Sequence, residues 1–382
     1  MEQDWIALTD PDISSHELAA VADVLKSSRL SAGPVVERFE AEFAESLGRS
    51  YGIAVASGTT ALMVSLRAMG IGPGDEVIAS AYSWHQIAHA IVLVGATPIF
   101  ADIDYWSGTL AVDKAEAKIT PHTRAIVAGN TNGHPAAWEP LRALANAHGI
   151  RLIEDSTEAI GSRYKGGLVG TFGDLSIFDF SQPSAMVCGE GGMIVTDDPD
   201  LASELYYHRS RRLDERFSIS IGSRIPHQAA ISDMTAALGL AQLDRLEEIL
   251  ARRKRVEDYY SRYIQSFEGI KPSYVAPEVD EVHWMVYVIH LGTRFTRSAR
   301  NQIVDDLSTA EIEAAAYCNP LHLNYFYGNL GYRKGDLFVT EKVSDRSLAL
   351  PFHGHLYDDT IEFIVTTAKD SSVNVGAGAA IY

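Results

Sequence analysis

The segment GDLSIFDFSQPSAMVCGEGG, from Gly173 to Gly192, decides the fold of this chain. Its apolar run LSIFDF predicts a strand and the residues after it a short loop. The glycines at its end predict a hinge, because glycine adopts positive φ angles without strain. The next run, GGMIVTD, predicts another strand directly after the hinge. These two strands complete a sheet that begins further upstream.

Upstream of this segment, short apolar runs alternate with helical stretches from Tyr51 onward. We expect helices from Thr59 and over His85 to Val94. The runs between them are GIAVAS, EVIAS, TPIFADI, TRAIVAG and RLIEDS. Such alternation indicates βαβ units, and therefore an α/β fold with a mostly parallel sheet flanked by helices. Ligands in such sheets bind beyond the carboxyl ends of the strands, so we expect the site there.

Amphipathic helices are expected on both sides of these sheet segments. The first begins after Ser14, which has capping-box spacing to Glu17, and another follows the SAGP turn as VVERFEAEFAESL. After the sheet we expect a helix from about Pro199 to Arg212 and one long helix from Ser232 to Phe267. The long helix carries charges on its expected outer face, among them Arg245, Glu247, Arg252 and Lys254.

The chain has 382 residues, which is too long for one compact core. We expect a large domain over residues 1–250, made of an N-terminal arm and the sheet, and a smaller C-terminal α/β domain over residues 251–382. The final segment, SSVNVGAGAAIY, is rich in small residues, and we expect its last residues to be disordered.

Composition narrows the function classes. Acidic residues outnumber basic ones by 50 to 32, and the net charge of −18 argues against nucleic acid or an anionic membrane as the partner. No run of about 18 apolar residues or secretory leader is present, so we expect a cytoplasmic protein that acts on a small molecule. Cys188 and Cys318 match no zinc or redox spacing, so we expect buried thiols and no metal site.

The first candidate site motif is Ser57-Gly58-Thr59-Thr60, which follows a predicted strand and opens a helix. Backbone N–H groups and the positive end of the helix dipole make such a position suited to an anion. A helix that starts with small residues is also common for packing reasons alone, so both interpretations stay open.

Further candidates follow the ends of other strands. Trp84 can stack on a flat ring, although a core aromatic is an equal alternative. Asp155 ends the strand RLIEDS, with Glu158 three residues on, and a carboxylate there can pair with a protonated ring nitrogen. A strand-end aspartate is as often a helix cap.

Together these motifs resemble the sugar aminotransferases of the DegT/DnrJ/EryC1/StrS family, which have the fold-type I pyridoxal phosphate architecture. The resemblance covers nearly the whole chain, through SAGP, SGTTAL, GDEVI, GATPIFADID, IEDSTEAIGSRYKG, GDLSIFDF, GEGGMIVTDD, AALGLAQL and NPLHLNYFYGNLGYRKGD. It implies a fold-type I homodimer with shared active sites and a role in deoxyaminosugar or natural-product biosynthesis. A fold does not fix the reaction, however.

The resemblance also implies roles for single residues. Asp155 matches the partner of the pyridine nitrogen, and Trp84 the aromatic that stacks on the ring. Thr59 and Thr60 match the helix start that cradles the phosphate. Glu158 matches a position, usually glutamine, near the phenolic oxygen of the cofactor.

Four positions depart from the family pattern. Ser184 stands where the family has its Schiff-base lysine, and no lysine occurs between Lys165 and Lys254. Asp179 replaces a serine that bonds the cofactor phosphate, and a carboxylate repels a phosphate unless it is protonated. Gln228 replaces an asparagine that reaches the neighbour's phosphate, and Ala230 replaces the arginine that follows the asparagine.

We therefore expect an enzyme that works without pyridoxal phosphate, by acid–base catalysis in the former cofactor pocket. Asp155, Glu158 and Asp179 would line this pocket, with Trp84 as its wall and Ser184 at its floor. Crowded carboxylates raise one another's proton affinity, which suits acid–base work or the binding of an amine. Ser57, Gly58, Thr59, Thr60 and Gln228 would then contact the substrate instead of a cofactor.

Three alternatives remain. In the first, pyridoxamine phosphate or pyridoxal phosphate binds non-covalently, as in dehydratases that resemble this family, with His85 or His134 as the base. In the second, the chain is a non-catalytic subunit or binding protein. In the third, it is an ordinary transaminase, which the lack of an amine at Ser184 disfavours.

Overall fold

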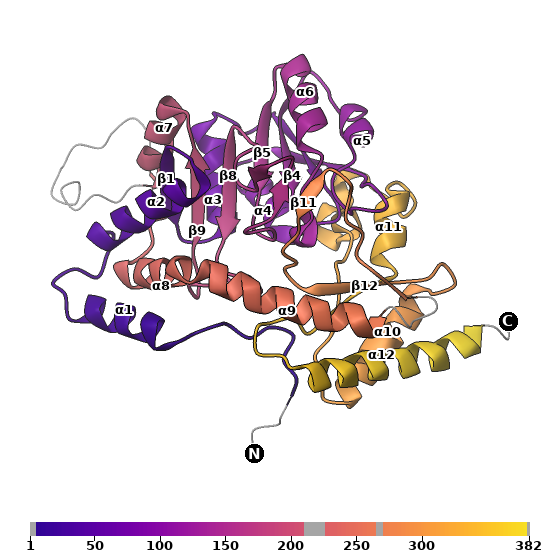
Figure 1. Cartoon of the computed structure of the whole chain (residues 1–382). Helices are drawn as coiled ribbons and strands as arrows, with labels where there is room; N and C mark the ends of the chain where they lie inside the picture. The colour runs from indigo at the N-terminus through magenta and orange to yellow at the C-terminus, as the bar shows by residue number, and fades with distance from the viewer. Residues whose placement is uncertain (1–4, 210–225, 265–269, 380–382) are drawn as a thin grey trace.

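The computed structural model describes residues 5–209, 226–264 and 270–379 of the chain (Figure 1). Its centre is a seven-stranded sheet with the order β1-β9-β8-β5-β4-β2-β3. The strands β8, β5, β4, β2 and β3 run parallel, whereas β9 is antiparallel to both of its neighbours, β1 and β8. The bounds are β1 Tyr51–Val55, β2 Glu76–Ser80, β3 Thr97–Ala101, β4 Thr123–Gly129, β5 Arg151–Asp155, β8 Leu175–Asp179 and β9 Gly192–Thr196. The mostly parallel α/β sheet predicted from the apolar runs is confirmed.

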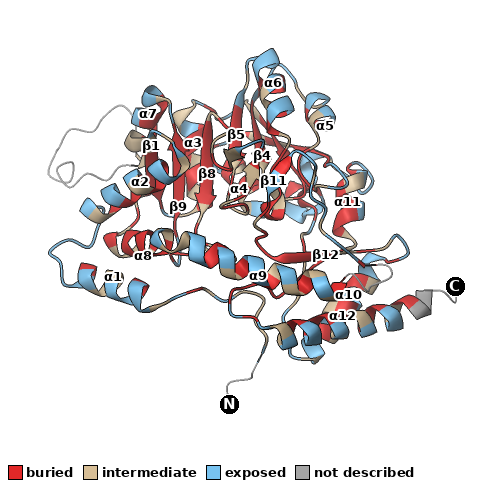
Figure 2. Cartoon of the chain, in the orientation of Figure 1, coloured by how far each residue is buried: buried red, intermediate tan, exposed pale blue. Residues whose placement is uncertain are grey.

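Helices bury both faces of this sheet, as the predominantly buried strands in Figure 2 show. Successive side chains of a strand point to opposite faces, so Ile177 packs in one core cluster and its neighbour Phe178 in another. One face is covered by α3, α4 and α7, the other mainly by α2, α6 and α8. The bounds are α2 Pro34–Leu47, α3 Gly58–Ala68, α4 His85–Leu93, α6 Trp138–His148, α7 Pro199–Arg209 and α8 Asp233–Asp244, and the short α5 Val112–Glu116 lies beside α6.

A second, antiparallel sheet lies in the C-terminal part, with the order β10-β12-β14-β13. Its strands are β10 Ile270–Pro272, β12 Tyr287–Leu291, β13 Ala315–Ala316 and β14 Ser347–Leu350. The helices of this part are α9 Leu246–Ile264, α10 Arg297–Thr309, α11 Phe338–Ser344 and α12 Asp358–Ala379, with short 3₁₀ turns at Leu321–Leu323 and Tyr325–Leu330. A further 3₁₀ turn, Thr131–Gly133, follows β4 of the central sheet. A small sheet joins the two parts, formed by β6 Arg163–Tyr164, β7 Gly167–Leu168 and β11 Val279–Glu281.

The N-terminal arm is tied to both parts of the chain. The helix α1 (Ser15–Leu25) begins with the predicted capping box between Ser14 and Glu17 and packs against α8. Before it, Ile6 pairs with Ile312, and Phe352 N donates to Leu8 O at 2.9 Å. The division at residue 250 stays a prediction, and this residue lies inside α9.

The long helix predicted from Ser232 to Phe267 is wrong in one respect, because it divides into α8 and α9 at Arg245. There φ is −105° and ψ is 6°, away from helical values. The Arg245 side chain is only 13% exposed, because its guanidinium binds the carboxylates of Asp12 and Glu17. Its predicted place on the outer face is therefore also wrong.

The C-terminal segment, whose last residues were expected to be disordered, forms the end of α12 up to residue 379. Ser371 Oγ donates to Asp306 of α10 at 2.5 Å, and Ser372 is buried. Val375 packs partly buried against the core. These tertiary contacts outweigh the low helix propensity of the small residues.

Residues 380–382, and residues 210–212 of the predicted helix that became α7, lie outside the described part. Within that part, no helix is long and apolar enough to cross a membrane.

Candidate functional site

Four chain segments meet at the carboxyl end of the parallel strands. Asp155 ends β5 and Asp179 ends β8, and these two strands are parallel neighbours. Gly58 begins α3 just after β1, and Trp84 directly precedes α4 after β2. These side chains therefore lie together beyond the carboxyl ends of the strands, where the site was predicted.

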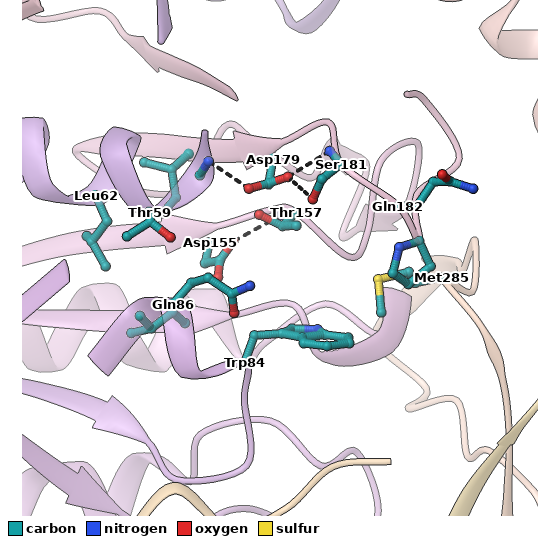
Figure 3. Close-up of a pocket in the computed structure, with 14 residues that line it drawn as sticks. Thr59, Leu62, Trp84, Gln86, Asp155, Thr157, Asp179, Ser181, Gln182 and Met285 are labelled. Carbon is teal, nitrogen blue, oxygen red and sulfur yellow. Dashed lines mark hydrogen bonds between the residues drawn. The ribbon is translucent and has the colours of Figure 1, made fainter. Parts of the chain in front are cut away.

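These segments enclose a cavity with about 570 Å³ of space between its lining atoms, part of it open to solvent (Figure 3). Two carboxylates line it, and none of its described lining residues is a lysine, arginine or histidine. The lining residues are Gly58, Thr59, Leu62, Trp84, Gln86, Ile87, Asp155, Thr157, Ile177, Asp179, Ser181, Gln182, Pro183 and Met285. The electrostatic character of the cavity is therefore anionic.

Asp179 fills the N-terminus of α3. Its Oδ2 accepts a hydrogen bond from Gly58 N at 2.7 Å, and its Oδ1 accepts from Ser181 N at 2.7 Å and Ser181 Oγ at 2.5 Å (Figure 3). The contact is so close that a Cβ on Gly58 would lie 2.7 Å from the Asp179 side chain. A helix N-terminus attracts an anion through its free N–H groups and dipole. Here the chain supplies that anion itself.

The neighbouring polar groups of the α3 start are also engaged. Ser57 is the N-cap, and its Oγ accepts from Thr60 N at 3.2 Å and lies 3.0 Å from Thr60 Oγ1. Ser57 and Thr60 thus cap the helix and do not line the cavity, whereas Thr59 does. Trp84 and Asp155, which line the cavity, fit a flat pyridine ring. The start of α3 does not fit the phosphate of a pyridoxal cofactor, because Asp179 occupies it. Ser184 has no amine to form a Schiff base with that cofactor.

Asp155 faces this cavity with an unusual proton affinity. Burial raises the pKa of Asp155 to about 6, and the charges of Asp179 and Glu154 add to this, against hydrogen bonds from Thr157. Glu154, next to it, has a different role: it accepts from Gly170 N at 2.7 Å and Phe172 N at 2.8 Å on the opposite side of the strand. Of the two adjacent carboxylates, Asp155 is therefore the one available for chemistry.

Glu158 lies beside the cavity but does not line it. Its carboxylate accepts hydrogen bonds from Tyr317 Oη at 2.5 Å and from Asn132 N. Burial raises the pKa of Glu158 to about 7, and the charge of Asp155 adds to this, against the hydrogen bonds of Tyr317, Asn132 and Trp84. Glu158 is therefore hydrogen-bonded to both parts of the chain, and its raised pKa lies near neutral pH.

Glu158→Gln is expected to stabilise the protein at pH 8 but not at pH 5. The folded pKa of Glu158, about 7, lies above its ordinary value of 4.5, so its contribution to stability is present below pH 4.5 and lost as pH rises through 7. Glutamine avoids burying that charge, with a gain of up to about 3 kcal/mol at pH 8. Thermal unfolding at both pH values measures this, and Glu116→Gln on the exposed part of α5 serves as a control. An equal shift of the melting temperature at pH 5 and pH 8 would contradict the raised pKa.

The remaining predicted site residues lie outside the cavity. Ser184 follows the lining residue Pro183, and its Oγ accepts from Met186 N at 3.3 Å, so the loop presents Ser181, Gln182 and Pro183 instead. His85 is exposed at the start of α4, with its ring 4.7 Å from His89. Gln228 is exposed on this chain with a φ of 52°.

His134 has a structural environment. It is buried, Ala276 N donates to its Nε2 at 3.1 Å, and its Nδ1 lies 2.8 Å from Pro135 O. The described residues contain no group of three or more histidine, cysteine, aspartate or glutamate side chains that could hold a metal ion.

Sequence reasoning missed several residues of the site. Ser181 and Gln182 belong to the segment quoted first, and their position directly after a strand end was the signal for them. Met285 and Tyr317 come from the C-terminal part, and no local pattern marks them.

Three comparisons place the chain among known proteins. A model of the DegT/DnrJ/EryC1/StrS aminotransferase family matches residues 11–369. The spore coat polysaccharide biosynthesis protein SpsC of Bacillus subtilis is 33% identical over 374 residues, covering 94% of this chain and 95% of SpsC. The GDP-perosamine synthase of Caulobacter vibrioides is 33% identical over 364 residues, covering 94% and 96%.

Solved structures agree over the same length. The PMP-form of Spr1654 from Streptococcus pneumoniae, whose structure is described as a "Putative sugar aminotransferase", superposes with a TM-score of 0.92 at 26% identity. The match covers 98% of this chain and all of Spr1654. The PLP-form of the same protein has a TM-score of 0.90 and covers 97% of this chain and 99% of the other. The fold is therefore that of a fold-type I aminotransferase.

Proposed function

Because the chain belongs to the DegT/DnrJ/EryC1/StrS aminotransferase family, we propose that it is an enzyme of sugar or natural-product biosynthesis that works without pyridoxal phosphate. Its chemistry is acid–base catalysis on a small, amine-bearing molecule in the cavity at the strand ends. Relatives named for polysaccharide biosynthesis and for GDP-perosamine synthesis support this setting.

The observation that carries the proposal is the hydrogen bond from Gly58 N to Asp179 Oδ2. A phosphate at the start of α3 would have to displace this carboxylate or share the helix N-terminus with it. Two unit negative charges about 4 Å apart repel by about 4 kcal/mol at an effective dielectric constant near 20. Together with Ser184 in place of an amine, this supports a site that holds no covalent cofactor.

Asp155 is the proposed catalytic base or acid of this site. Its pKa of about 6 leaves it mostly ionised at neutral pH but able to accept a proton with little cost, which is the range in which general acid–base groups work best. Glu158, whose pKa is about 7, holds a second proton outside the cavity, with Tyr317 Oη as its hydrogen-bond donor. In this role Glu158 and Tyr317 position charge and are not in contact with the substrate.

The charges of the cavity select the ligand. Asp155 and Asp179 supply negative charge without a basic lining residue, and the Trp84 ring forms a wall (Figure 3). An ammonium group between carboxylates and an aromatic face gains both ion pairing and cation–π attraction. An amino sugar combines such a group with a polar ring, which fits the names of the relatives.

Asp155→Asn is expected to weaken the binding of an amino sugar at least tenfold, because it removes one of the two carboxylates that face the ammonium group. Calorimetric titration with glucosamine measures this, with N-acetylglucosamine as the neutral ligand that should bind more weakly to the unchanged protein. Asp113→Asn, on exposed α5, is the matched control and should leave binding unchanged. Equal affinity for the amine and its N-acetyl form would contradict the proposed ligand.

A second candidate is a dehydratase-like enzyme that binds pyridoxamine phosphate non-covalently. The retained Trp84 and Asp155, which both line the cavity, favour it. Incubation with pyridoxal phosphate or pyridoxamine phosphate, followed by dialysis and an absorbance spectrum, separates the two functions. The cofactor-free proposal requires that neither compound is retained, and saturable retention of pyridoxamine phosphate would replace it with the second candidate.

We also propose a homodimer with shared sites, as the family resemblance implies. Gln228 then reaches the partner's cavity and not its own, in agreement with its exposure on the single chain.

A further inference from the structure

A second cavity lies where the C-terminal part of the chain meets the loop after β3. It is formed by β10 and the residues after it, the end of β12, the C-terminal half of α11 and the loop after β3. Met285 of the first cavity precedes β12, whereas Leu291 of the second ends it. A five-residue strand spans about 16 Å, so the two cavities are separate sites.

Three cations line this second cavity: Lys271, Lys342 and Arg346. None of them forms an ion pair with the described residues, and no aspartate or glutamate of that part of the chain is among the lining residues. Arg346 Nε donates to Lys342 O at 3.0 Å, which orients the guanidinium and leaves its two terminal nitrogens without a hydrogen bond to described residues. In a chain with a net charge of −18, this is a local site for an anion.

The sheet holds these groups in register. Lys271 of β10 is the cross-strand partner of His290 in β12, and His290 is the partner of Ser347 in β14. Cross-strand partners project from the same face of a sheet. Leu291 N donates to Arg346 O at 2.9 Å, which attaches the arginine to the same strand end. Lys271 thus lies on the sheet, and Arg346 is joined to it by a backbone hydrogen bond.

His290 adds a neutral acceptor to this face. Ser347 Oγ donates to Val343 O at 2.8 Å, so it accepts from His290 Nδ1 at 3.0 Å. This fixes the proton on Nδ1 and leaves Nε2 as an acceptor. Burial lowers the pKa of His290 to about 4, with the charge of Arg346 contributing, and the ring stays uncharged at neutral pH.

Aromatic rings form the other wall of the second cavity. Tyr105, Trp106 and Tyr274 are 44%, 58% and 42% exposed although they are large and largely apolar. The ring of Trp106 lies 5.1 Å from Tyr105 and 6.0 Å from Tyr274, with interplanar angles of 89° and 51°, so the three rings form one cluster. Lys342 Nζ also lies 5.5 Å from the centre of the Phe338 ring, and it still has no carboxylate partner among the described residues. Exposed rings beside such cations are suited to a flat ring that carries negative charge, since stacking and ion pairing then act on one molecule.

We propose that this second cavity binds a phosphorylated small molecule that carries a flat ring, the chemistry of a nucleoside phosphate. The phosphate groups contact Lys271, Lys342 and Arg346, and the ring lies on Trp106 and its aromatic neighbours. This inference does not depend on the proposed chemistry of the first cavity.

Calorimetric titration of the full chain with ADP, UDP, inorganic pyrophosphate and uncharged adenosine tests the proposal. ADP or UDP is expected to bind more tightly than pyrophosphate, and adenosine more weakly than ADP. Because ion pairs contribute, affinity should fall as salt rises. Absence of binding by ADP and UDP at millimolar concentration would overturn the site, and pyrophosphate as tight as ADP would overturn the role of the rings.

Three variants assign the binding to this cavity. Lys271→Gln and Arg346→Gln are each expected to weaken ADP about tenfold, whereas Trp106→Ala should weaken ADP but leave pyrophosphate unchanged. Lys26→Gln, which removes an exposed positive charge just after α1, is the control. Binding that survives all three variants but is strengthened in Asp155→Asn or Asp179→Ser, which each remove a negative charge from the first cavity, would place the nucleotide there and contradict the proposal.

Discussion

Replacing Asp179 by serine and Ser184 by lysine together is expected to create pyridoxal phosphate binding where the unchanged protein has none. Asp179→Ser frees Gly58 N and removes a repulsion of about 4 kcal/mol, which corresponds to roughly a thousand-fold in affinity. Ser184→Lys supplies the amine that a Schiff base requires. The measurement is the absorbance spectrum after incubation and dialysis, with a Schiff-base band expected in the double variant alone.

Single variants separate the two contributions. Asp179→Asn keeps the size of the side chain but removes its charge, so it should raise non-covalent affinity, whereas Ser184→Lys alone should remain weak because the carboxylate still occupies the helix N-terminus. Ser181→Ala, which removes only a hydroxyl donor to Asp179, is the matched control. A double variant that folds with an unchanged melting temperature yet gains no affinity would refute Asp179 as the excluding group and point to Gln228 and Ala230.

Arg245→Ala is expected to cost about 3 kcal/mol of stability, because removing one partner of a buried ion pair leaves an uncompensated charge. Glu17 is 1% exposed and accepts a hydrogen bond from Arg245 Nη1 at 2.5 Å. Asp12 is 7% exposed and accepts a hydrogen bond from Arg245 Nη2 at 2.7 Å. Asp12 has a second partner, Arg252, at 3.2 Å, so we expect the loss to fall mainly on Glu17. Chemical unfolding at pH 7 measures the difference.

The ion pair between Arg245 and Glu17 also predicts that the effect of Arg245→Ala on stability depends on pH. Burial by itself would raise the pKa of Glu17, but hydrogen bonds from Ser14 and Arg245 lower it to about 2. A lowered carboxyl pKa contributes stability above pH 4.5 that is lost as pH falls towards 2, so the gap between the variant and the unchanged protein should narrow over that range. Arg38→Ala, which breaks an exposed pair with Glu42 on α2, should cost less than about 0.5 kcal/mol. A gap that stays constant from pH 7 to pH 3 would argue against the ion pair as the source of the loss.

The residues at the strand ends show which part of the site could be predicted from local sequence patterns. Asp155 and Asp179 each follow an apolar run, and parallel neighbours end at the same edge, so their meeting in one cavity could be predicted. Glu158 was expected in the same cavity but lies beside it, because Tyr317 and Asn132 hold its carboxylate. Tyr317 is 159 positions further along the chain, and no sequence period connects residues at such a separation.

Arg245 and the end of α12 show the same limit for the fold. Helical periodicity placed Arg245 on an outer face, but the N-terminal arm covers that face and brings two carboxylates to it. The segment from Ser371 is rich in small residues of low helix propensity, and packing against α10 stabilises a helix there. Periodicity describes one helix or strand at a time, whereas the burial of its residues depends on which other elements pack against it.

The sequence by itself determined the α/β architecture, the family and the departures from its pattern at Ser184 and Asp179, because apolar periodicity and ordered motifs are properties of neighbouring residues. Only the tertiary structure decided that Asp179 occupies the start of α3, that Glu158 joins Tyr317, and that three cations and three rings surround a second cavity. The physical reason is that hydrogen bonds, burial and ion pairing act through space, between side chains that the chain order keeps far apart.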